Sequence, residues 1–334
     1  MKKQLAVWMG ILGMASLAIV GCDRAAEESE SDVPVVVTTT TMLEDLVREL
    51  GGEDVKTLGI MPLGADPHVY QPRPGDARVV AGSDAVVMNG LLLEGWMDSL
   101  VRHAGGERPV IVASDALDEA SLLSLEGAVD PHVWFDVGMW RQVAAHVTDG
   151  LVPLVDDEAA DRIRARHAAY DEVLAGLDGW VRGQMESIPS GRRVLITSHD
   201  AFGYFGRAYG IDVEAIQGLS TEQEASQRDV ANIIELVRRT NAPAVFMESS
   251  VHPGLIQQVA RETDAEAAGP LYSDSLGPES AGAHTYVGMI HANVRMITEA
   301  LGGDYQAFEV STNLGVPVDE PAEELLPEME EEGA

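Results

Sequence analysis

The strongest constraint on the fold is a long amphipathic segment near the middle of the chain. Between about residues 156 and 188, apolar side chains recur every three or four positions without an internal proline, which is typical of one continuous helix. A helix of about 30 residues would be roughly 45 Å long, which is more than an ordinary connection needs. We therefore expect a linking helix between two lobes, residues 33–155 before it and residues 189–303 after it.

Apolar runs that look like strands alternate with helical spacing on both sides of this segment. The expected strands are residues 33–39, 55–60, 85–88, 110–112, 194–197, 244–248 and 271–274, and the expected helices include 43–50, 94–104 and 285–301. Such alternation is typical of a parallel sheet covered on both faces. The sequence therefore predicts an α/β protein with two lobes, each a parallel sheet flanked by helices, joined by one long rigid helix.

Two identical Asp-Pro-His tripeptides occur at residues 66–68 and 130–132. Proline fixes its own φ and pushes the preceding residue into an extended conformation, so the imidazole that follows leaves a stiff loop in a defined direction. The aspartate could also hold the second ring nitrogen, as partners of metal-bound histidines do. We interpret His68 and His132 as half of a metal site; the alternative is that they are hydrogen-bonded loop histidines.

Two further candidates follow expected strands of the second lobe. His199 comes after the strand at 194–197, and Asp274 ends the segment 271–274. Ligands of such sheets lie beyond the carboxyl ends of the strands, where all four candidates are expected. His199 could instead cap a helix, and Ser-Asp at a strand end is also a common turn signal.

The other titratable residues are weaker candidates for a metal site or for catalysis. The histidines without a stiff loop or a motif, which we assign to surface or packing roles, are His103, His146, His252, His284 and His291. His167 lies on the apolar stripe of the long helix, where core packing is the expected role. Glu248 ends a strand and could support a ligand. For a hydrolase, the only remote candidates for a general base are Glu222 and Glu224.

The N-terminus indicates where the protein works. Residues 1–21 combine a short basic region with an apolar stretch of signal-peptide length, and the sequence Ile-Val-Gly-Cys at 19–22 resembles the lipobox of bacterial lipoproteins. That resemblance implies cleavage before Cys22 and lipid attachment to its sulfur. Cys22 is the only cysteine, so the chain has no intramolecular disulfide and no thiolate metal site. We expect residues 22–32 to be a flexible tether on the outside of a bacterial membrane.

The charge of the chain limits its partners. A formal net charge of −33 argues against binding to nucleic acid or to anionic lipid head groups. We interpret most of this acidity as a solvated surface. Residues 304–334 are predicted to be an acidic, disordered tail without an assigned role.

Several motifs together resemble the metal-binding lipoproteins of bacterial ABC importers for zinc and manganese. They are TTTMLEDLVRELGGEDV, GADPHVYQPRPGD, NGLLLEGWMDSL, DPHVWFD, TSHDAFGYFGRAYG and LYSDSLG, in that order within residues 33–301. The resemblance implies that His68, His132, His199 and Asp274 occupy the four ligand positions, as in the subgroup with three histidines and one aspartate. It also implies two lobes joined by a rigid helix, and a permease as the partner.

The chemistry of these four residues leaves the ion open between zinc and manganese. Three imidazoles and a carboxylate suit tetrahedral zinc, whereas a bidentate carboxylate would admit manganese. Zinc-specific relatives often carry a histidine-rich loop before the second Asp-Pro-His motif, and residues 114–129 contain no histidine.

The leading hypothesis is therefore a non-enzymatic, monomeric substrate-binding protein that captures the ion outside the cytoplasm and delivers it to a permease. The alternatives are a metal-dependent hydrolase and a surface adhesin with a structural metal.

Overall fold

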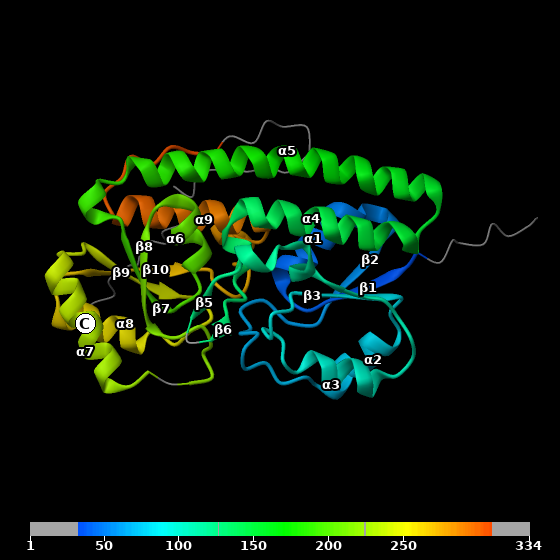
Figure 1. The fold of residues 1–334 in the computed structure, drawn as a ribbon, viewed down its shortest axis with the longest axis horizontal. Helices are drawn as coiled ribbons and strands as arrows, with labels where there is room; N and C mark the ends of the chain where they lie inside the picture. The colour runs from blue at the N-terminus through cyan, green and yellow to red at the C-terminus, as the bar shows by residue number, and fades with distance from the viewer. Residues whose placement is uncertain (1–32, 126, 224, 309–334) are drawn as a thin grey trace, which may run out of the picture. The chain divides into compact units, whose positions relative to one another are not determined.

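The N-terminal lobe of the computed structural model is built on four parallel strands in the order β2-β1-β3-β4 (Figure 1). The strands are β1 (Val35–Thr38), β2 (Lys56–Gly59), β3 (Ala85–Met88) and β4 (Val110–Val112). The structure describes residues 33–308 except 126 and 224. The predicted signal peptide, the tether with Cys22 and the tail beyond residue 308 lie outside the described residues.

Helices cover both faces of this sheet because successive side chains of a strand point to opposite sides. Val36 of β1 packs into a core with α1 (Thr41–Gly51) and α4 (Val137–Leu151). Its neighbour Val37 faces the other side, where α2 (Pro74–Ala81) and α3 (Met97–Ala104) supply apolar side chains. Burial of β1 on both faces explains why this strand reads Val-Val-Val-Thr without polar alternation.

The expected long helix is α5 (Asp157–Ser187), with 31 residues. It begins at the N-cap Asp156, whose side chain accepts the backbone N–H of Ala159 at 2.9 Å. Its buried stripe packs against α1 and α4 in one half of the protein and against α9 (Tyr286–Ala300) in the other (Figure 1). The helix therefore belongs to both lobes.

The C-terminal lobe contains two parallel strand pairs. Strand β7 (Val194–His199) pairs with β8 (Asp212–Gln217), and β9 (Ala244–Glu248) pairs with β10 (Glu266–Leu271). Strand β7 also lies against β9, which brings the two pairs together. The helices of this lobe besides α9 are α6 (Gly203–Tyr209), α7 (Gln227–Thr240) and α8 (Gly254–Glu262). The α/β class with parallel strands and flanking helices agrees with the prediction.

The structure differs from the expected elements in several places, and helices α2, α4, α6, α7 and α8 and strand β8 were not among the expected elements. The strand expected at 271–274 ends at Leu271, because β10 covers the preceding residues and Ser273 and Asp274 follow it in a loop. An antiparallel hairpin of β5 (Ser124–Leu125) and β6 (Ala128–Val129) was not anticipated. Residues 304–308, assigned to the tail, pack on α5: the Trp180 indole donates to the carbonyl of Gln306 at 2.8 Å.

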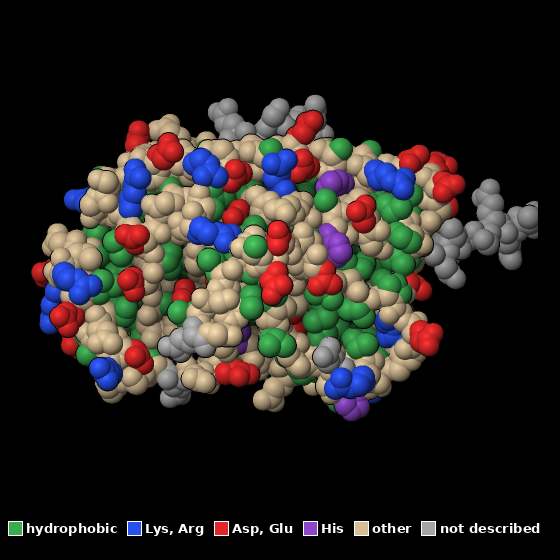
Figure 2. Space-filling view, in the orientation of Figure 1, with side chains coloured by type: hydrophobic (Ala, Val, Ile, Leu, Met, Phe, Trp, Pro, Cys, Tyr) green, Lys and Arg blue, Asp and Glu red, His purple; other side chains and the backbone are tan. Residues whose placement is uncertain are grey.

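Asp and Glu side chains are spread over the visible face of the protein, among Lys and Arg (Figure 2).

Within residues 33–308, as far as they are described, no helix has the length and apolar character needed to span a bilayer.

Candidate metal centre

The side chains of His68, His132, His199 and Asp274 converge at one point, each offering a ligand atom within 4.8 Å of the others. His68 comes from the loop between β2 and α2, and His132 from the loop between β6 and α4. His199 ends β7, and Asp274 follows β10. Two side chains from each lobe therefore meet, although they are spread over more than 200 residues of sequence.

The spacing of these atoms suits a small cation. The Nε2 atoms of His68 and His132 are 3.2 Å apart, and Asp274 Oδ1 lies 3.9 and 3.5 Å from them. His199 Nε2 lies 3.4 Å from Asp274 Oδ2. Ligands about 2.0–2.1 Å from a tetrahedral zinc ion are about 3.4 Å from one another. The four groups thus surround a space of the right size for zinc.

The first Asp-Pro-His loop is held by groups on both sides of its proline. Asp66 Oδ1 accepts the backbone N–H of His68 at 2.9 Å, and the Trp96 indole donates to the carbonyl of Pro67 at 3.1 Å. Burial lowers the pKa of His68 to about 3, so its imidazole is neutral at physiological pH. A neutral imidazole is the form that coordinates a metal ion.

In the second motif the aspartate also orients the ring. Asp130 Oδ1 accepts the backbone N–H of His132 at 3.0 Å and lies 2.7 Å from its Nδ1, which leaves Nε2 directed at the cluster. The Asn89 amide donates to the carbonyl of Pro131 at 3.0 Å. Burial by itself would lower the pKa of His132, but Asp130 and Asp274 outweigh it and raise this pKa to about 9.

His199 is supported by the buried carboxylate of Glu248 at the end of β9. Glu248 Oε1 accepts the backbone N–H groups of Ser198 and His199 at 2.8 and 2.9 Å, and Oε2 lies 2.6 Å from His199 Nδ1. Burial opposes protonation of this imidazole, but Glu248 and Asp274 outweigh it and raise the pKa of His199 well above its usual range. A metal ion that binds Nε2 of His199 would therefore have to displace the proton that the raised pKa keeps on the ring.

The Asp274 carboxylate is anchored by one oxygen and unsatisfied at the other. Oδ2 accepts the hydroxyls of Ser250 and Ser273 at 2.8 and 3.2 Å. Oδ1 is buried and has no hydrogen-bond partner within the described residues. Burial raises the pKa of Asp274, but the neighbouring imidazoles outweigh it and hold this pKa well below its usual range. An ionised oxygen without a hydrogen bond inside a protein is costly unless a positive charge lies beside it, and a metal ion among the three imidazoles would supply that charge.

A turn between β3 and α3 supports both histidine loops and was missed by sequence reasoning. The buried Glu94 accepts the backbone N–H of Asn89 at 2.8 Å and the hydroxyl of Thr39 at 2.5 Å. This turn carries Asn89 and Trp96, which bind the two proline carbonyls. Its Leu91 has a positive φ of 53°, an unusual conformation for a leucine. The sequence feature that could have indicated this turn is the motif NGLLLEGW, in which the glutamate lies within a run of apolar residues.

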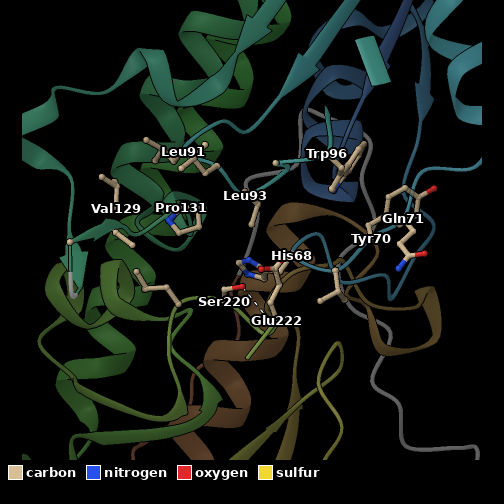
Figure 3. Close-up of a pocket in the computed structure, with 16 residues that line it drawn as sticks. His68, Tyr70, Gln71, Leu91, Leu93, Trp96, Val129, Pro131, Ser220 and Glu222 are labelled. Carbon is tan, nitrogen blue, oxygen red and sulfur yellow. Dashed lines mark hydrogen bonds between the residues drawn. The ribbon is translucent and has the colours of Figure 1, made fainter. Parts of the chain in front are cut away.

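The remaining candidates lie away from the four ligand atoms. His103, His252 and His284 are exposed, while His146, His167 and His291 are half-buried, and none is part of the cluster. His291 stacks on Trp180 and contacts the Tyr305 hydroxyl at 2.7 Å. Glu222 lines a cleft of about 830 Å³ beside His68, and Glu224 lies outside the described residues (Figure 3).

The chain is similar to several known proteins. A model of the family described as zinc-uptake complex component A, periplasmic, matches residues 36–300. The zinc-binding protein TroA of Treponema pallidum is 38% identical over 274 residues, which are 80% of this chain and 89% of TroA. The manganese-binding lipoprotein MntA of Bacillus subtilis is 34% identical over 301 residues, which are 88% of this chain and 98% of MntA. The solved structure of the Treponema protein matches with a TM-score of 0.77, covering 80% of this chain and 99% of that chain.

Proposed function

The chain belongs to the family of zinc-uptake complex component A, periplasmic, as its motifs indicated, and from this membership we propose the following function. The protein is an extracytoplasmic substrate-binding component of an ABC importer that captures a divalent transition-metal ion and delivers it to the permease. It is not an enzyme. One observation supports this function most strongly: four side chains of the kinds that ligate metals, from opposite lobes, surround one small, buried space.

The proposed ligands are the Nε2 atoms of His68, His132 and His199 and the carboxylate of Asp274. The donor set suits zinc, and Asp274 could hold manganese with both oxygens, since its Oδ1 faces two imidazoles and its Oδ2 faces the third. Relatives named as zinc-binding and as manganese-binding support the same two ions as cargo.

We place the protein on the outside of a bacterial membrane as a monomer held by a lipid on Cys22. The relative from Bacillus subtilis is named as a lipoprotein, which supports this anchor. The lipobox-like sequence at 19–22 supplies the modified residue. Mass spectrometry of the membrane-extracted protein tests it, and an unmodified Cys22 would contradict the anchor.

The ligand assignment is tested by elemental analysis and by competition titration of zinc and manganese on the purified protein. We expect one ion per chain, and a loss of affinity of at least about a hundredfold in His68→Ala and Asp274→Ala, because each removes a ligand from a four-ligand site. His103→Ala, which changes an exposed histidine, is the matched control. Unaltered affinity in both ligand variants would rule out the assignment.

The site does not favour the alternative functions. A catalytic metal keeps an open position for water with a base beside it, whereas the side chains of His132, His199 and Asp274 are fully buried. An adhesin with a structural metal predicts unchanged metal uptake after deletion of the gene. The importer function predicts a growth defect of the deletion strain under metal starvation, relieved by added metal.

A further inference from the structure

The two Asp-Pro-His motifs use their aspartates differently. In both, the carboxylate Oδ1 accepts the backbone N–H of the histidine two residues on, at 2.9 Å for Asp66 and 3.0 Å for Asp130. Asp130 also contacts the ring of its own histidine, whereas the second oxygen of Asp66 accepts the hydroxyl of Thr221 at 2.5 Å. Thr221 lies 155 residues further along the chain, in the C-terminal lobe, so this bond joins the two lobes.

The loop between β2 and α2 is tied to the C-terminal lobe at a second point. The backbone N–H of Gly64 donates to the Ser275 hydroxyl at 2.7 Å. Ser275 is buried and adjoins Asp274, so a change there would disturb a proposed ligand directly. Thr221 is half-buried and does not belong to the cluster. A substitution of Thr221 can therefore remove one bond between the lobes without changing a proposed metal ligand.

The connection lies beside the cleft that leads to the cluster. The lining of the cleft includes His68 from one lobe and Ser220 and Glu222 from the other (Figure 3). The His68 side chain is 5% exposed, whereas the side chains of His132, His199 and Asp274 are 0% exposed. An ion that leaves the cluster therefore passes His68, between its loop and residues 218–223.

We propose that Thr221 is a positioning residue that sets how fast the metal ion leaves the site. Its hydroxyl holds the loop of His68 against residues 218–223 without contacting the ion, and the ion escapes when this bond opens. Hydrogen bonds to carboxylates are among the stronger ones in proteins, so losing this donor leaves Asp66 Oδ2 poorly satisfied and the loop freer to move. This inference rests on the proposed metal-capture function and adds a determinant of its release rate.

The test is a stopped-flow measurement of zinc release from the purified protein into an excess of a fluorescent zinc chelator. Thr221→Val removes the hydroxyl and keeps the shape of the side chain, and we expect about tenfold faster release. Thr221→Ser keeps the hydroxyl. Thr240→Val is the matched control, because it makes the same change at a half-buried threonine outside the cleft, whose hydroxyl donates to the carbonyl of Leu236 within α7 at 2.9 Å. Both should release zinc within about twofold of the wild-type rate.

Three results would overturn the proposal. They are release from Thr221→Val at the wild-type rate, equal acceleration in Thr240→Val, and fast release from Thr221→Ser. Melting of the zinc-free variants provides a separate check, since a large drop in the melting temperature of Thr221→Val would show a merely structural role. If the wild-type protein bound no zinc or manganese at all, the proposed function itself would fail. The three results above would instead overturn only the role of Thr221 in release.

Discussion

At the scale of single residues, each proposed ligand has a different supporting group. A carboxylate orients His132 and another orients His199, while hydroxyl groups anchor one oxygen of Asp274. His68 is held through its backbone instead, and its ring is the most exposed of the four. Supporting groups of this kind fix the direction of the ligand atom, and losing one typically lowers metal affinity about 10- to 100-fold.

The first prediction concerns Glu248, which contacts His199 on both its ring and its backbone. Glu248→Gln keeps the size of the side chain but removes the negative charge beside Nδ1, so we expect zinc affinity to fall about 10- to 100-fold. Glu235→Gln, an exposed position on α7, is the control and should bind zinc like the wild type. Competition titration measures both; equal affinity of the two variants would mean that Glu248 does not support the site.

The second prediction concerns Asp45, a buried carboxyl on α1 that accepts the backbone N–H of Tyr286 at 2.7 Å. Burial raises its pKa to about 7 in the folded protein, from an ordinary value of 3.8. Between these values the folded state binds more protons than the unfolded state, so the contribution of Asp45 to stability is present below about pH 4 and is lost as the pH rises through about 7. The full loss is at most about 4 kcal/mol.

Asp45→Asn should remove this pH dependence, because the amide oxygen can still accept the Tyr286 N–H and carries no charge. We expect the variant to be more stable than the wild type at pH 8, with a much smaller difference at pH 4. Urea unfolding of the metal-free proteins at the two pH values measures the free energies of unfolding. Parallel stability profiles of the two proteins would contradict the expected pKa.

The sequence indicated which four residues would meet and pointed to two supporting carboxylates, Asp130 and Glu248, but not to the contacts that hold the loops. His68 and His132 stood out because a repeated tripeptide is visible without any knowledge of the fold. The contacts of Asn89 with Pro131 and of Thr221 with Asp66 join residues that are far apart in sequence, so only tertiary packing creates them. The aspartates of the two motifs look equivalent in the sequence and differ in the structure for this reason.

At the scale of elements, the helices and strands with a regular apolar pattern were predicted best from the sequence. The long helix and strands β1, β3, β4 and β9 lie close to where apolar periodicity or β-branched runs placed them. Strand β10 was displaced in the prediction because Gly269 and Pro270 interrupt its apolar pattern near the end. Helices α4 and α7 were not assigned, although the apolar residues of both recur at helical spacing.

The third prediction concerns the glycines inside α5. A methyl group added at Gly179 or Gly183 would meet no heavy atom within 4 Å in the described residues beyond the helix's own backbone. Glycine inside a helix loses more conformational freedom on folding than alanine, so Gly179→Ala and Gly183→Ala should each stabilise the protein by about 0.5–1 kcal/mol.

Gly210, which ends α6, provides the control for this prediction. It also has open space for a methyl group, but its φ of 71° is left-handed, so Gly210→Ala should destabilise the protein by about 1 kcal/mol. Urea midpoints of the three variants measure these effects. A loss of stability in the two α5 variants would show that the helix needs the flexibility of its glycines.

At the scale of the whole molecule, the site lies where the two lobes meet. Besides α5, hydrogen bonds cross between them: the Trp134 indole donates to the Ser273 carbonyl at 2.9 Å, and the backbone N–H of Leu276 donates to the Thr41 hydroxyl at 2.8 Å. The ligands come from both sides of this contact. A captured ion therefore adds a connection between lobes that are already joined by a helix and by several polar contacts.

The last prediction follows from this position of the ion. An ion that binds only the folded protein stabilises it by mass action, by about 2.7 kcal/mol when free zinc is a hundredfold above its dissociation constant. The melting temperature should therefore rise with zinc concentration and return to its starting value when a chelator is added. Asp274→Ala should lose this rise, because a ligand from the C-terminal lobe is missing, whereas Asp264→Ala, at an exposed position, should keep it. A zinc-dependent rise of wild-type size in Asp274→Ala would place the ion somewhere other than between the lobes.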